Sequence, residues 1–115
     1  MKDDLFYVEH ILECIEKIDK FSRGGEAEFL GSELIQDAVL RNLQILAEST
    51  KRLTEAVKAA TPSIQWSAVI GFRSVLVHEY LGLNLESVWR IVVLDLPTLR
   101  KHLTEVHQRL VSGGQ

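Results

Sequence analysis

The sequence predicts an all-α domain, an up-and-down bundle of four to five helices. Apolar residues recur at intervals of three and four along most of the 115 residues, which is the period of an amphipathic helix. No segment shows the sustained alternation of a strand bounded by hairpin turns. Short breaks separate the periodic segments, so successive helices should pack antiparallel. The length fits one domain, residues 1–115, in which we expect residues 112–115 to form a flexible tail.

Two apolar stripes separated by a glycine pair predict the first two helices. The first helix covers about residues 5–22, and Gly24 and Gly25 end it. Ser32 can cap the second, which we expect to run without interruption to about residue 59. Its stripe repeats at four, three, four, three and four: Val39, Leu43, Leu46, Thr50, Leu53 and Val57.

Proline, glycine and asparagine mark the remaining boundaries. Pro62 should start a third helix over about residues 64–81, with Gly82 as its C-terminal stop. Asn84 can cap a fourth helix over about residues 85–94. Asp95 and Pro97 should separate it from a fifth, whose stripe is Leu96, Leu99, Leu103, Val106 and Leu110.

Composition excludes several classes of protein. With 46% apolar and 25% charged residues the chain should be soluble and globular, and no apolar run approaches the length of a membrane span. The charged start lacks the apolar core of a signal peptide. The single cysteine, Cys14, fits a reducing cytoplasm, and we interpret it as a small buried hydrophobic residue.

The net charge of −3 argues against a protein whose whole surface binds nucleic acid. A nucleic-acid hypothesis therefore needs a local basic site. Arg41, Lys51, Arg52 and Lys58 of the second helix are candidates for such a basic lip. The alternative is that they are solvated charges paired with Glu48 and Glu55.

Residues 73–80 are the most unusual part of the chain. They place Arg73, His78 and Tyr80 inside an otherwise apolar helix. Burial of a polar group without a hydrogen-bond partner costs roughly 2–7 kcal/mol of folding free energy. On a helical wheel Arg73 shares a side with Tyr80, whereas His78 follows a stripe of small and polar residues. That stripe consists of Ser67, Gly71, Ser74 and His78, and small residues allow a second helix to approach closely.

We interpret this small stripe as a seam that could join two protomers and bring two copies of His78 together. Histidine transfers protons near pH 7, and the fork of an arginine matches phosphate oxygens. Together they suit a metal-independent attack of a ribose 2′-hydroxyl on its own phosphate. The alternative stays open that Arg73 pairs with Glu48 or Asp37 and that His78 is a core or interface histidine.

The other candidate residues indicate structure. His10, His102 and His107 share no ligand spacing, so we expect no metal site, and we place His102 and His107 on the solvated face of the last helix. Trp66 and Trp89 should be core or interface anchors.

Several stretches together resemble the HepT-like family of HEPN-domain proteins, the toxins of HepT/MntA toxin–antitoxin pairs. The core of the likeness is the Arg-x4-His-x-Tyr pattern of residues 73–80, inside residues 71–80. It extends over nearly the whole chain, through residues 37–43, 62–66, 88–89 and 96–97.

The resemblance implies a HEPN-like homodimer with a composite ribonuclease site at its interface, which needs no metal and no cofactor. It assigns catalysis to Arg73 and His78. It also implies that an MntA-like nucleotidyltransferase antitoxin adds AMP to Tyr80 and silences the nuclease. The expected partners are therefore RNA and the antitoxin, with a homodimer that could enter a larger hetero-oligomer.

Two departures from the family pattern bear on function. Relatives commonly carry asparagine just after the motif arginine, where this chain has Ser74. They often carry Gly-Glu-Ala in the long helix, where this chain has residues 47–49 with Glu48 retained. We assign Ser74 and Glu48 supporting roles. The alternative function is a catalytically inactive HEPN bundle that serves as a dimeric binding module for the nucleotidyltransferase.

Overall fold

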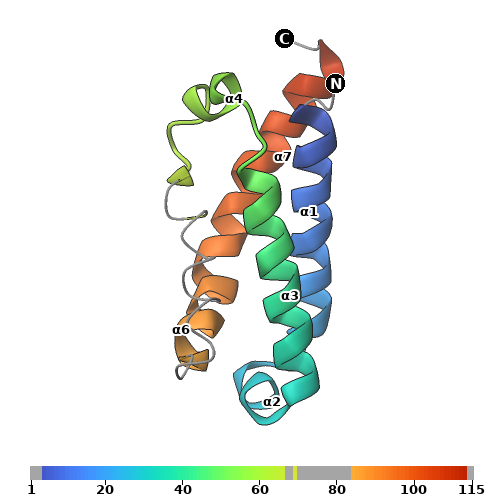
Figure 1. The fold of residues 1–115 in the computed structure, drawn as a ribbon, viewed down its shortest axis with the longest axis vertical. Coiled ribbons are helices and arrows are strands. Elements are labelled where there is room, and N and C mark those ends of the chain that lie inside the picture. Colours follow the sequence, from blue (N-terminus) through green and yellow to red (C-terminus); the bar gives the residue numbers. More distant parts are fainter. Residues whose placement is uncertain (1–3, 67–68, 70–83, 114–115) are drawn as a thin grey trace.

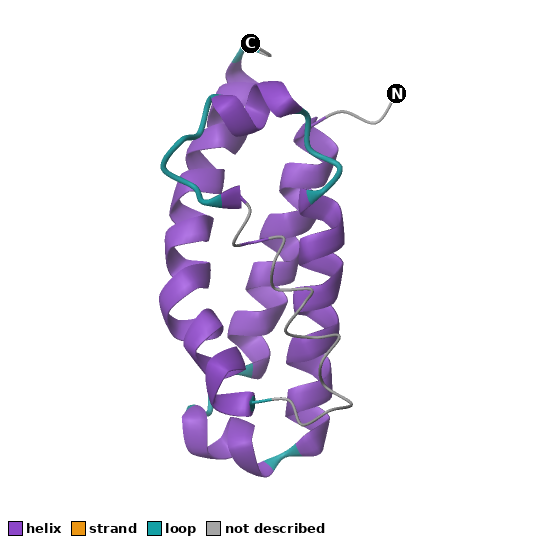
Figure 2. Ribbon diagram, turned by 60° about the vertical axis from the view of Figure 1, so that its left-hand side comes forward, coloured by secondary structure: helices purple, strands orange, loops and turns teal. Residues whose placement is uncertain are grey.

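The computed structural model describes residues 4–66, 69 and 84–113, and every regular element within them is a helix. The predicted all-α class is therefore confirmed for this part of the chain (Figures 1 and 2). In chain order the elements are α1 (Asp4–Phe21), α2 (Glu26–Gly31), α3 (Glu33–Thr50), α4 (Glu55–Ala59), α6 (Leu85–Arg90), the π-helical segment η2 (Ile91–Asp95) and α7 (Leu96–Ser112).

Helix α1 lies between two long neighbours. It packs against α3 along one flank and against α7 along the other, and both neighbours run antiparallel to it (Figure 1). The short helix α2 turns the chain from α1 into α3, and α4 lies near the opposite end of the bundle (Figure 1). This arrangement is compatible with the expected up-and-down bundle.

The core is built from the stripes that the periodicity predicts. On α1, Val8, Ile11 and Ile18 are completely buried, and Val39, Leu43 and Leu46 face them from α3. Cys14 is also buried, as expected for a small hydrophobic residue, and burial raises the pKa of its thiol. The stripe of α7 completes this core with Leu96, Leu99, Leu103 and Val106.

The prediction of one uninterrupted helix over residues 33–59 was wrong. Ser32 caps α3 as expected, accepting a hydrogen bond from the Ile35 amide, but the helix ends at Thr50. A new helix, α4, begins after Thr54, whose hydroxyl accepts from the Val57 amide. The backbone N–H and the hydroxyl of Thr54 also donate to the Asp4 carboxylate, at 2.9 and 2.7 Å.

Contacts with α1 therefore fix Thr54 in an extended conformation that interrupts the helix. The periodicity concealed this break because Leu53 and Val57 remain buried on either side of it. The helix α2 was also missed, since six residues are too few to show a period. Gly25 enters it with φ at 93°, a conformation that favours glycine. Its Phe29 is fully buried.

The start of the predicted third helix is anchored in the core. Trp66 is buried, and its Nε1 donates to the Thr61 hydroxyl at 3.0 Å, which in turn donates to the Val57 carbonyl. Trp89 packs on Phe29 with ring centroids 5.3 Å apart. Both tryptophans are thus the structural anchors that we expected. Of the predicted helix over residues 64–81, the structure describes Ile64, Gln65, Trp66 and Val69. The other residues of this range lie outside the described residues.

The last part of the chain contains a second correction. Asn84 caps α6 as predicted, because its side chain accepts from the amides of Glu86 and Ser87. The chain does not leave the helical conformation at Asp95 and Pro97, however. It continues through η2, where the Leu96 amide donates to the carbonyl of Ile91, five residues earlier. The wider turn accommodates Pro97 in the first turn of α7. Helix α7 includes Ser112, which we had assigned to the tail.

Candidate functional site: a groove between α1 and α3

Four of the five predicted site residues, Arg73, Ser74, His78 and Tyr80, lie outside the described residues. The same applies to Ser67 and Gly71 of the predicted seam. The fifth site residue, Glu48, is half-buried on α3. It lines a groove of about 380 Å³ that separates the outer faces of α1 and α3. We call this the α1–α3 groove; the described residues that line it are Phe6, Tyr7, His10, Arg41, Gln44, Ile45, Glu48, Ser49 and Arg52.

A hydrogen bond and a ring contact define the α1 side of this groove. His10 Nδ1 and Ser49 Oγ are 3.0 Å apart, so the imidazole of α1 is tied to a buried hydroxyl of α3. The Phe6 ring meets Tyr7 edge to face, with centroids 5.1 Å apart and planes at 85°. Although it makes these contacts, Phe6 remains 47% exposed. The groove therefore presents an aromatic ring to solvent beside a positioned histidine.

Two arginines give the α3 side its charge. Arg41 and Arg52 are both exposed, and neither forms an ion pair with a carboxylate among the described residues. They are two of the four residues that we predicted as a basic lip, and the structure brings them to the same groove as Glu48. Lys51 and Lys58 are not part of its lining. The spacing of residues 41, 44, 45, 48 and 52 places the lining residues on one face of the helical path.

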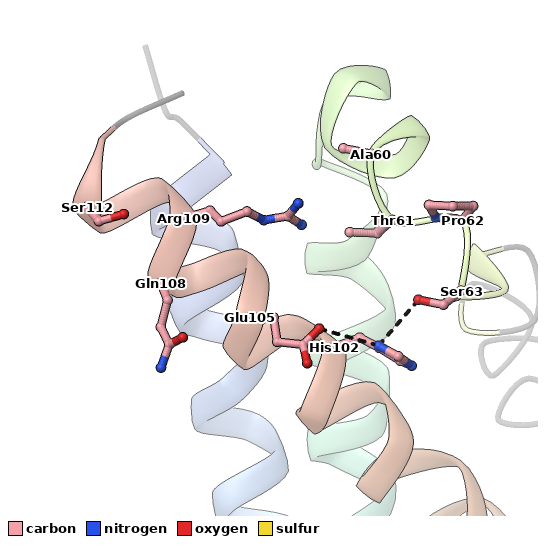
Figure 3. A pocket seen from close by; sticks show the side chains of 9 residues that line it. All are labelled: Ala60, Thr61, Pro62, Ser63, His102, Glu105, Gln108, Arg109 and Ser112. Atoms are coloured by element: carbon pink, nitrogen blue, oxygen red, sulfur yellow. Dashed lines mark hydrogen bonds and ion pairs between the residues drawn. The ribbon is translucent and has the colours of Figure 1, made fainter.

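A larger cavity of about 670 Å³ lies between the segment 60–63 and α7 (Figure 3). It contains a serine, a histidine and a glutamate, which are the residue types of a catalytic triad. Ser63 Oγ lies 3.3 Å from His102 Nδ1, and Glu105 Oε1 lies 3.9 Å from the same nitrogen. In a triad the base contacts nucleophile and carboxylate through different ring nitrogens, so these contacts do not form one.

The histidines of α7 are partly exposed, in keeping with the solvated position that we expected, and both also contact other segments. His102 bonds to Ser63, and His107 Nε2 lies 3.0 Å from Glu9 Oε2 of α1. Sequence spacing within α7 carries no signal for such contacts, because each partner is distant in the chain. No group of three or more His, Cys, Asp or Glu side chains suited to a metal ion occurs in the described part. No helix there is long and apolar enough to cross a bilayer.

Comparison with known proteins identifies the family. The model of the family described as Ribonuclease HepT-like matches residues 11–106, which include the whole pattern 73–80. The chain belongs to the HepT-like ribonuclease family. The resemblance inferred from sequence motifs is thereby confirmed.

Three relatives indicate how far the likeness extends. A protein of Thermococcus cleftensis named as a probable ribonuclease HepT is 36% identical over 82% of this chain and 86% of its own length. A candidate RNase of Caldanaerobacter subterraneus subsp. tengcongensis is 30% identical over 95% of this chain and 98% of its own length. A Methanocaldococcus jannaschii protein, named as a gamma-glutamylcyclotransferase and candidate RNase, is 32% identical over 95% of this chain, which spans only 50% of that relative. No solved structure matches the chain.

Proposed function

We propose that the protein is a metal-independent endoribonuclease, the toxin of a type VII-like toxin–antitoxin pair. The observation that carries the proposal is the family match over residues 11–106, because it contains the pattern formed by Arg73, His78 and Tyr80. Relatives that share most of the chain are named as ribonucleases, which supports the same reaction class.

The proposed reaction needs only proton transfer and charge stabilisation. His78 takes the proton of a ribose 2′-hydroxyl, whose oxygen bonds to the adjacent phosphorus while the bond from phosphorus to the 5′-oxygen breaks. A proton is delivered to the departing 5′-oxygen, by the second His78 if two protomers share the site. Arg73 stabilises the negative charge of the phosphorane. The products are a 2′,3′-cyclic phosphate and a 5′-hydroxyl.

Supporting and regulatory roles complete the proposal. Ser74 and Glu48 orient the site, and the role of Glu48 is supported by its half-buried position in the α1–α3 groove. An MntA-like antitoxin adds AMP to Tyr80, and the bulky anion then excludes RNA by steric hindrance and like-charge repulsion. We further propose a cytoplasmic homodimer that could join the antitoxin in a larger assembly.

The decisive experiment compares RNA cleavage in EDTA by the unmodified wild type, Arg73→Ala and His78→Ala. We expect each substitution to lower the cleavage rate roughly 100- to 10,000-fold, the usual contribution of a positioned acid–base or charge-stabilising group. His102→Ala is the matched control. His102 lies outside the Arg-x4-His pattern, so this variant should cleave RNA at the wild-type rate. Equal, negligible cleavage by wild type and both pattern variants would instead favour the inactive binding module.

Regulation is tested separately by mass spectrometry after co-expression with an MntA-like nucleotidyltransferase. We expect an AMP adduct on Tyr80 that Tyr80→Phe lacks. An unmodified Tyr80 in fully inhibited protein would contradict control by modification and leave inhibition by binding.

A further inference from the structure

We propose that the α1–α3 groove binds single-stranded RNA, with Arg41 and Arg52 holding the phosphate backbone and Phe6 stacking on a base. The inference rests on the proposed ribonuclease function for its choice of ligand. Its location comes from the geometry of the groove, whose described lining belongs to α1, α3 and the turn that follows α3.

The local charge of the groove favours an anionic ligand. Among the described residues of its lining two arginines oppose one glutamate, whereas the chain as a whole carries a net charge of −3. Arg41 and Arg52 have no ion-pair partner among the described carboxylates, so a ligand phosphate would not have to displace one. A guanidinium binds phosphate with two parallel hydrogen bonds.

The two arginines lie at separate points along the helical path. Arg41 is on α3 and Arg52 is in the turn that follows it, 11 positions later, and a helical rise of 1.5 Å per residue corresponds to a backbone separation of about 16 Å. A strand that crosses the groove can therefore place different phosphates of its backbone near the two arginines.

The exposed aromatic ring favours unpaired bases. Phe6 is 47% exposed and lines the groove, so its ring is accessible to a ligand bound there. Tyr7 supports it by an edge contact, and the His10 ring lies 6.3 Å away at an angle of 32°. Stacking on such a ring requires a base that is free of a duplex, which selects a single strand.

The test measures the binding of a fluorescein-labelled RNA of roughly 12 nucleotides, within the span of known single-strand sites, by fluorescence anisotropy at several salt concentrations. All riboses carry 2′-O-methyl groups, so the proposed self-cleavage of the strand is chemically blocked and binding is observed alone. We expect Arg41→Gln/Arg52→Gln to weaken binding and to reduce the slope of log affinity against log salt by about 1.4, since each phosphate contact contributes roughly 0.7.

The ring contribution is tested by Phe6→Ala, which should weaken binding roughly 5- to 150-fold, whereas Phe6→Tyr should retain it because stacking survives. Matched controls remove the same charge or a similar apolar group elsewhere on the surface. These are the double variant Arg23→Gln/Arg90→Gln and the single variant Val111→Ala, all at exposed positions. Circular dichroism and thermal unfolding of every variant verify that the fold is intact.

The outcomes separate this inference from the proposed function. Binding that depends on the groove, in a protein that cleaves no RNA, would support the groove and contradict the nuclease. Wild-type affinity and salt slope in the folded groove variants would overturn the inference even if the protein cleaves RNA. A change of oligomeric mass in these variants with unchanged RNA binding would also overturn it, since the groove would then be a protein interface.

Discussion

Helix α1 meets its two neighbours in different ways. Towards α7, polar side chains pair across the interface: Asp19 with Arg100 at 2.8 Å, and Glu9 with the His107 ring at 3.0 Å. Towards α3, a continuous apolar layer holds the helices together. The arginines outside this layer take no part in ion pairs with described carboxylates.

The difference indicates which surface charges are available for a ligand. On the α7 flank the charges already have protein partners, so a ligand would have to compete with them. On the α3 flank Arg41 and Arg52 remain accessible, while the hydrophobic layer below maintains the fold. Because exposed ion pairs contribute only about 0–1 kcal/mol each, the α7 flank should gain little stability from its pairs.

The largest effect should come from the apolar layer between α1 and α3. Leu43 is completely buried, so Leu43→Ala should lower the free energy of unfolding by about 2–5 kcal/mol through lost transfer energy and a residual cavity. Leu34→Ala is the control, because Leu34 is 81% exposed on the same helix and should change stability by less than about 0.5 kcal/mol. Urea unfolding followed by circular dichroism measures both; similar losses would contradict the importance of this layer.

An intermediate effect is expected where α1 holds the break after α3. Asp4→Ala removes the carboxylate that accepts from the Thr54 amide and hydroxyl, and should cost about 1–2 kcal/mol. Asp4→Asn should recover part of this loss because it retains one acceptor oxygen. Asp37→Ala provides an exposed acidic control on α3. If Asp4→Ala unfolds at the same urea concentration as wild type, these hydrogen bonds do not stabilise the break.

The smallest effect should come from the α7 flank. A double-mutant cycle of Asp19→Ala and Arg100→Ala should give a coupling energy of about 0.2–1 kcal/mol that falls further in high salt. The same cycle on Asp19 and Arg90, which form no ion pair in the described part of the fold, should give no coupling. A coupling energy of several kcal/mol would contradict the expectation that the ion pairs with α7 stabilise the fold less than the apolar layer with α3 does.

Local sequence signals predicted the parts of the fold that depend on one segment at a time. The stripes of α1, α3 and α7 follow from periodicity, and Ser32 and Asn84 act as the caps that their positions indicated. The break after Thr50 was not predictable in this way, because it depends on a carboxylate 50 residues away from Thr54.

The candidate site shows the same limit. The pattern of Arg73, His78 and Tyr80 was found from residue types and resemblance, and its geometry stays a prediction because it lies outside the described residues. Arg41 and Arg52 were singled out for their charge. Their convergence with Phe6 and His10 of α1 was missed, since it arises only when two helices pack side by side. No spacing within either helix encodes that contact.

The π-helical turn at Ile91–Asp95 affects how this chain can change in length. A π turn is equivalent to one residue inserted into an α-helix, so deletion of the exposed Val93 would return the path to regular α-helix and leave Val88 and Leu99 on the same side. A deletion within α7 cannot be absorbed in this way. Every later position would rotate by about 100° about the helix axis, which would carry Leu103 and Val106 out of the core. Relatives of different length should therefore gain or lose residues at this turn more readily than anywhere in α7.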